Sequence, residues 1–146
     1  MNIQDLKNKV MSAVQLFIDN DLGLLCLKVY EPAVSHRIAF YLEREFFKEG
    51  FHVDCEYDKR FDLGKPGPGG KPMRPDIVVH TRNQSANNEI AIEIKKTRTS
   101  KCDIQKLKML TQKGGLYEYC LGVFIYFPNN KSRFMWFVDG AGIDLE

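Results

Sequence analysis

The chain has 146 residues, of which 44% are apolar and 27% are charged. This length and balance predict a single domain over residues 1–146 with one hydrophobic core, and they exclude a disordered or fibrous protein. The formal net charge of +2 is too small to identify a nucleic-acid-binding protein, so that argument depends on how the charges are distributed.

The sequence carries no signal for a membrane, a disulfide framework or a zinc site. No apolar run approaches the roughly 18 to 20 residues that a transmembrane helix needs, and residues 1–10 lack the apolar run of a signal peptide. We therefore expect a cytoplasmic protein with no membrane partner. The four cysteines form no CxxC pair and are expected to be reduced structural thiols among apolar neighbours. The three histidines show neither HxxxH nor HExxH spacing, so zinc is not expected.

Two helices are predicted at the start of the chain. Apolar residues recur at three- and four-residue spacing over residues 3–19, which is typical of a helix with one buried stripe. A second helix is predicted from about 32 to 49, because Pro32 suits a first helical turn and Gly50 is a natural terminator.

The rest of the chain predicts five strands and one helix. Strands are predicted at 51–57, 73–81 and 89–95, a helix at 102–113, and strands at 120–127 and 133–138 before a short tail. The short link after the second strand favours a hairpin, and the strand–helix–strand passage implies a crossover between parallel strands. We therefore expect an α/β fold, a mixed central β-sheet flanked by helices in the order ααβββαββ.

Three charged residues converge in this predicted sheet. The strand period of two places Glu93 and Lys95 on one face of a strand in which the preceding residues 90–92 are Ile and Ala. Such charges are costly to bury without partners or a ligand, and Asp76 lies opposite them across the hairpin. The alternative is a solvated strand face with a weak surface ion pair.

Two carboxylates and an ammonium form a site for a hard cation. Magnesium takes one or two carboxylates and keeps several waters, so Asp76 and Glu93 suit Mg²⁺ or Mn²⁺ and leave room for a phosphate. Lys95 could lower the pKa of the attacking water or stabilise a charged transition state. Glu31 lies in line with the buried stripe of the second helix, where it either reaches the metal or favours the helix dipole.

Pro75-Asp76 followed by Glu93-Ile94-Lys95 closely resembles the PD-(D/E)XK motif of the restriction-endonuclease-like superfamily. The predicted order also resembles that superfamily's αβββαβ core, here with an extra N-terminal helix and C-terminal strand. Residues 31–96 look similar to a group of small uncharacterised bacterial and phage proteins within it. The resemblance implies that Asp76, Glu93 and the Ile94 carbonyl bind metal, that Lys95 is catalytic, and that Glu31 is the acid of the first core helix. It also suggests a homodimer.

Basic residues cluster directly after this motif. Residues 95–113 contain seven basic residues and a single acid, Asp103. They form either a solvated charged face or a phosphate-contacting surface. The candidates for nucleic-acid contact are Arg74, Lys96, Arg98, Lys101 and Lys106.

The glycine- and proline-rich segment 58–72 is either a DNA-contacting flap or a plain connection. It is not an ATP-binding loop, because its glycine spacing is wrong and Pro72 stands where Ser or Thr is needed. Glu43, Glu45 and Glu56 are expected to be solvent-exposed rather than part of the site.

Two functions of different classes follow from these features. The first is a metal-dependent nuclease that hydrolyses phosphodiester bonds, with DNA favoured over RNA as its partner. The second is a non-catalytic nucleic-acid or protein-binding module that retains the nuclease fold. The first is favoured because the acids and the lysine of the motif are all present.

Overall fold

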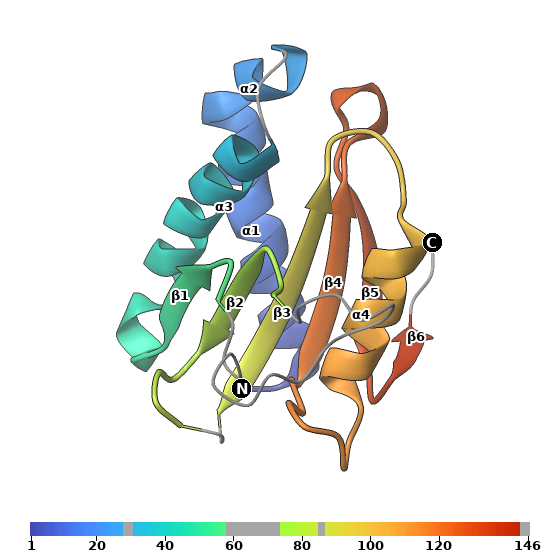
Figure 1. Cartoon of the computed structure of the whole chain (residues 1–146). Helices are drawn as coiled ribbons and strands as arrows, with labels where there is room; N and C mark the ends of the chain where they lie inside the picture. The colour runs from blue at the N-terminus through green and yellow to red at the C-terminus, as the bar shows by residue number, and fades with distance from the viewer. Residues whose placement is uncertain (28–30, 58–73, 85–86, 144–146) are drawn as a thin grey trace.

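A computed structural model describes residues 1–27, 31–57, 74–84 and 87–143. Six strands form one sheet in chain order (Figure 1): β1 (His52–Cys55), β2 (Ile77–His80), β3 (Asn88–Lys95), β4 (Leu121–Tyr126), β5 (Arg133–Val138) and β6 (Ala141–Ile143). Among the described strands, only β3 and β4 pair in parallel, and helix α4 (Lys101–Thr111) connects them. The expected mixed sheet, the β2–β3 hairpin and the parallel crossover are therefore confirmed.

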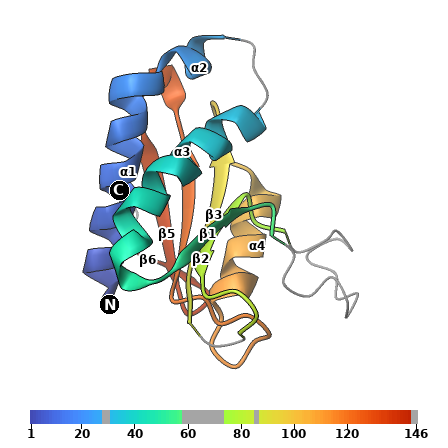
Figure 2. The same cartoon turned by 90° about the vertical axis from the view of Figure 1, so that its left-hand side faces the viewer.

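Helices cover both faces of this sheet. Helices α1 (Ile3–Asp21) and α3 (Glu31–Phe46) lie on one face and α4 lies on the other (Figure 2). A short helix, α2 (Gly23–Cys26), follows α1, and a 3-10 turn, η1 (Phe47–Glu49), follows α3. A second 3-10 turn, η4 (Pro128–Asn130), follows β4. Within the described part of the chain, no helix is long and apolar enough to cross a membrane.

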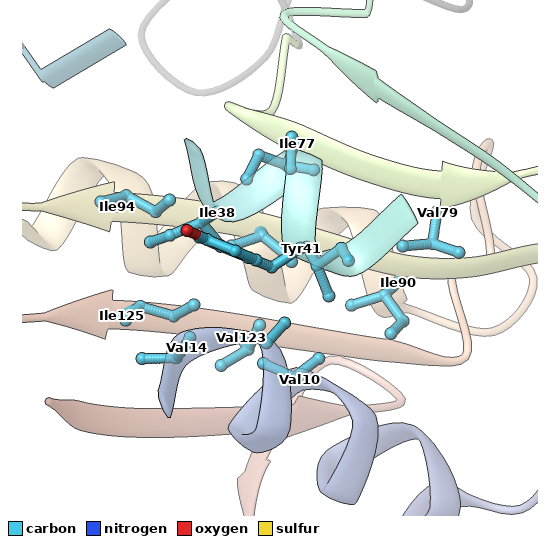
Figure 3. Packing of buried hydrophobic residues seen from close by; sticks show 14 of the residues in the cluster. Val10, Val14, Ile38, Tyr41, Ile77, Val79, Ile90, Ile94, Val123 and Ile125 are labelled. Carbon is cyan, nitrogen blue, oxygen red and sulfur yellow. The ribbon is translucent and has the colours of Figure 1, made fainter. Parts of the chain in front are cut away.

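The core has two parts because the sheet is enclosed. On the α1/α3 face, Val10, Val14 and Ile38 pack over isoleucines and valines of β2, β3 and β4 (Figure 3). On the α4 face, Leu107 and Leu110 of the helix pack against residues of the sheet and of the loop before β4. These residues are Val78, Ala91, Tyr117, Tyr119, Phe124 and Phe137. Fully burying one such aliphatic side chain contributes about 1.5–3 kcal/mol.

Strand β3 differs most from its expected pattern. Its alternation of polar and apolar residues predicts one solvent-exposed face, yet every residue from Asn88 to Ile94 is buried. The even-numbered isoleucines enter the α1/α3 core, while Ala91, Glu93 and Lys95 face α4. A parallel neighbour and helices on both sides leave no face of this strand in water.

Other differences are local. The second strand begins at Ile77 rather than at residue 73. Residues 141–143 form strand β6 against β5, although the sequence predicts a tail there. All four cysteines are free, as expected of reduced thiols, but they are exposed, so the expectation of structural thiols among apolar neighbours is wrong. Segment 58–72 lies outside the described residues.

Gly122 permits the close approach of α4 to the sheet. A Cβ added there would lie 2.9 Å from Thr111 Cγ2 and 3.3 Å from Phe137 Cβ. We expect Gly122→Ala to lower the free energy of unfolding by about 1–3 kcal/mol through overpacking, measured by urea denaturation. Gly23→Ala is the control, because nothing lies within 4 Å of its added Cβ. Wild-type stability of Gly122→Ala would contradict this account of the contact.

Candidate active site

The β2–β3 hairpin brings Asp76 next to Glu93. Ile77 pairs with Ile92 in the antiparallel register, so Asp76, the residue before β2, lies opposite Glu93. One Asp76 carboxylate oxygen accepts a hydrogen bond of 2.7 Å from the backbone N–H of Ile94. The Asp76 carbonyl accepts another, of 2.9 Å, from the N–H of Glu56. The aspartate is thus held from both neighbouring strands.

Asp76 and Glu93 form a desolvated carboxyl pair. Only 2% of Glu93 is exposed. Burial, and then the charge of Asp76, raise the pKa of Glu93 to about 9. Burial also raises the pKa of Asp76, although the Ile94 N–H and a hydrogen bond from Glu93 oppose the rise. Two such groups do not both ionise readily unless a cation joins them.

Helix α4 brings two residues to the carboxyl pair: Lys106, which the sequence predicts as a nucleic-acid contact, and Asp103, which the sequence does not assign to the site. Lys106 Nζ lies 2.6 Å from Glu93 Oε1 and 3.7 Å from Asp103 Oδ1. Asp103 follows the helix cap, where its N–H donates to Ser100 Oγ. The signal for Asp103 was its position as the single acid of the basic run, one helical turn before Lys106.

Lys95 lies among carboxylates at the end of β3. Its ammonium is 3.5 Å from Glu31 Oε2 and 3.7 Å from Asp103 Oδ2. Burial lowers the pKa of Lys95, but the charges of Asp103, Glu31 and Asp76 outweigh it, so the net shift is upward. Lys95 is therefore a stable cation.

Glu31 is placed by α3, the first turn of which it occupies. Its ion pair with Lys95 gives it a role besides the helix dipole, as a tether between α3 and the end of β3. Both side chains are more than a third exposed, which makes the pair weak, at most about 1 kcal/mol.

A polar pocket of about 660 Å³ opens beside Lys95. It is lined by Glu31, Lys95, and residues 96–100 of the loop that leads to α4. This loop contributes the cations Lys96 and Arg98 together with hydroxyl groups. Cations and hydroxyls are the groups that bind phosphate oxygens.

The five basic candidates for nucleic-acid contact differ in how far they are exposed. Arg74, Arg98 and Lys101 are exposed. Lys96 is half-buried and its ammonium donates to the carbonyl of Leu27. Lys106 points into the site, where it also donates to the carbonyl of Arg74 at 3.3 Å.

The rival acids Glu43, Glu45 and Glu56 contribute no side chain to the contacts described above, although the backbone N–H of Glu56 donates to Asp76. Glu43 and Glu56 are exposed, as expected. Glu45 is half-buried instead, because its carboxylate accepts a hydrogen bond of 3.0 Å from Ser12 between α1 and α3.

The donor set fits a hard divalent cation in its chemistry. Asp76 and Glu93 offer oxygen ligands, and their pKa values are raised chiefly because burial makes the charged carboxylates costly. Among the described residues, no group of three or more His, Cys, Asp or Glu side chains is arranged to hold a metal ion. A metal at this position would therefore depend on two carboxylates supplemented by backbone oxygen and water, which is common for Mg²⁺.

Comparisons with known proteins do not assign the chain to a family. No model of a protein family matches it, and no curated protein or solved structure matches it either. What the site can do is therefore inferred from the contacts of its own residues.

The burial of Glu93 makes a prediction about pH. A carboxyl group with a pKa of about 9 in the folded chain and 4.5 ordinarily binds its proton more tightly when folded. Its contribution to stability therefore falls as pH rises through that interval. Glutamine does not titrate, so we expect the stability of Glu93→Gln relative to wild type to increase by about 1–3 kcal/mol between pH 5 and pH 8.5.

Urea denaturation at both pH values measures this difference. Glu43→Gln, at an exposed position of α3, is the matched control and should follow the wild type. A Glu93→Gln curve parallel to the wild type across the pH range would contradict the assigned burial.

Proposed function

We propose that this protein is a metal-dependent nuclease that hydrolyses phosphodiester bonds, with DNA as the favoured substrate. One observation carries the proposal: the Asp76 and Glu93 carboxyl groups meet in a desolvated position at the end of β3, with Lys95 two residues further along. This is the arrangement that the PD-(D/E)XK resemblance implies.

Asp76 and Glu93 would hold Mg²⁺ or Mn²⁺, and the resemblance adds the carbonyl of Ile94. When bound, the ion would polarise a phosphoryl oxygen and lower the pKa of a coordinated water. The hydrogen bond from the Ile94 N–H orients the Asp76 carboxylate and prevents it from rotating away from Glu93.

Lys95 acts in this proposal through its positive charge. Because its neighbours raise its pKa, it keeps its proton near neutral pH and is a poor general base. The ammonium at this point instead stabilises the negative charge that develops on the phosphate during attack. Glu31 and Asp103 lie 3.5 and 3.7 Å from this ammonium and favour its charged form.

The substrate would approach over the polar pocket. Its lining residues Lys96, Arg98 and Ser100 offer donors for phosphate oxygens next to the scissile bond. Exposed Arg74 and Lys101 extend the basic surface along the backbone of a nucleic acid. Such contacts position a duplex without reading its sequence.

A second candidate is a non-catalytic nucleic-acid or protein-binding module with the same fold. The observation that favours it is the contact between Lys106 and Glu93, which supplies the carboxyl pair with a cation of the protein's own. Binding without metal, together with no cleavage of plasmid, single-stranded or branched DNA in Mg²⁺ or Mn²⁺, would select this candidate.

Cleavage assays on the Lys95 variants test the nuclease proposal. We expect Lys95→Ala to lower the cleavage rate by a factor of about 100 or more, because it removes a preorganised charge at the transition state. Lys95→Arg should retain more activity than Lys95→Ala, since charge rather than proton transfer is the proposed role.

Lys48→Ala is the charge-matched control. Lys48 is exposed in η1, which follows the end of α3 opposite to Glu31 (Figure 1), so its activity should equal that of the wild type. Full activity in Lys95→Ala would exclude the assigned mechanism.

A further inference from the structure

Among the basic residues that the structure describes, Lys106 makes the closest contact with the carboxyl pair. Its ammonium lies 2.6 Å from Glu93 Oε1, and the two side chains are only 15% and 3% exposed. It comes from α4, so it is separate in the chain from the hairpin that carries Asp76 and Glu93. A largely enclosed ammonium at this distance is a strong electrostatic partner, because little water screens it.

We propose that Lys106 is an internal counter-ion that competes with the divalent cation for Glu93 and thereby sets the metal affinity of the site. This inference rests on the proposed metal site and adds to it a residue that controls occupancy. Metal binding then requires the ammonium to withdraw from Glu93 Oε1.

The surroundings of Lys106 provide for this withdrawal. Asp103 Oδ1 lies 3.7 Å from the same ammonium, and the carbonyl of Arg74 accepts a hydrogen bond from it at 3.3 Å. Lys106 can therefore leave Glu93 and keep two other partners. If the Lys106 ammonium had no other partner, its separation from Glu93 would leave an enclosed charge unpaired, which is strongly destabilising.

The direction of the effect follows from charge. Removing the ammonium strengthens the binding of every cation at the carboxyl pair. A divalent ion carries twice the charge of a proton, so it gains more from the removal than a proton that competes for Glu93. The metal affinity of a neutral variant should therefore rise whether or not Glu93 is protonated in the metal-free protein.

Calorimetric titration of the full chain with MnCl₂ at pH 8 and low salt tests the proposal. Lys106→Met keeps most of the side-chain length without the charge, and we expect its affinity for Mn²⁺ to exceed that of the wild type by a factor of about ten or more. Lys106→Arg retains the charge and should remain within a factor of about three of the wild type.

Lys108→Met is the matched control, because Lys108 is exposed on the same helix. Its Mn²⁺ affinity should not change. Far-ultraviolet circular dichroism establishes that each variant is folded, and Lys106→Gln replaces Lys106→Met if the latter is not.

Unchanged or weaker Mn²⁺ binding by a folded neutral variant would overturn the proposal, as would the absence of Mn²⁺ binding in every variant. The two proposals fail separately. Tighter binding in Lys106→Met without cleavage of any DNA by the wild type supports the counter-ion and rejects the nuclease. Metal-dependent cleavage by the wild type, together with an unaltered Mn²⁺ affinity in Lys106→Met, supports the nuclease and rejects the counter-ion.

Discussion

The enclosure of β3 is the constraint on which the rest of the structure depends. Helices α1 and α3 cover one face of this strand and α4 covers the other, so its isoleucines and Ala91 form the centre of the two core regions. The same enclosure removes water from Glu93. An apolar core therefore continues directly into a charged site, and the carboxyl group there is costly to ionise without a cation.

The β2–β3 hairpin and helix α4 both contribute residues to that site. The β2–β3 register and the Ile94 N–H fix Asp76 beside Glu93, while α4 brings Lys106 and Asp103 against them from the other side. The buried Glu93 carboxyl group and the half-buried Asp76 beside it are costly to ionise together. Perturbed carboxyl pairs of this kind are frequent at functional sites.

Much of this arrangement could be predicted from the sequence because it depends on local periodicity. The period of two in β3 predicts that Glu93 and Lys95 share a face opposite to Ile94, and the short hairpin link predicts that Asp76 is their neighbour. Both are observed. The order of the helices and first five strands is confirmed for the same reason.

The remainder depends on tertiary packing. The pattern of residues 102–113 does not show how α4 is rotated over the sheet, so the sequence predicts Lys106 as a nucleic-acid contact and does not assign Asp103 to the site. Strand β6 was missed because three residues with a central glycine carry almost no strand signal until β5 pairs with them. The full burial of β3 likewise depends on α4 and β4, which its own alternation does not encode.

We propose that the Asp76 and Glu93 carboxyl groups form a site for a divalent cation. Anomalous diffraction from a crystal of the protein grown with Mn²⁺ locates the ion directly. We expect a manganese peak in contact with both carboxylates, and we expect the ammonium of Lys106 to have moved away from Glu93 Oε1. A well-ordered site without manganese, at millimolar Mn²⁺ and with Lys106 still in contact with Glu93, would contradict it.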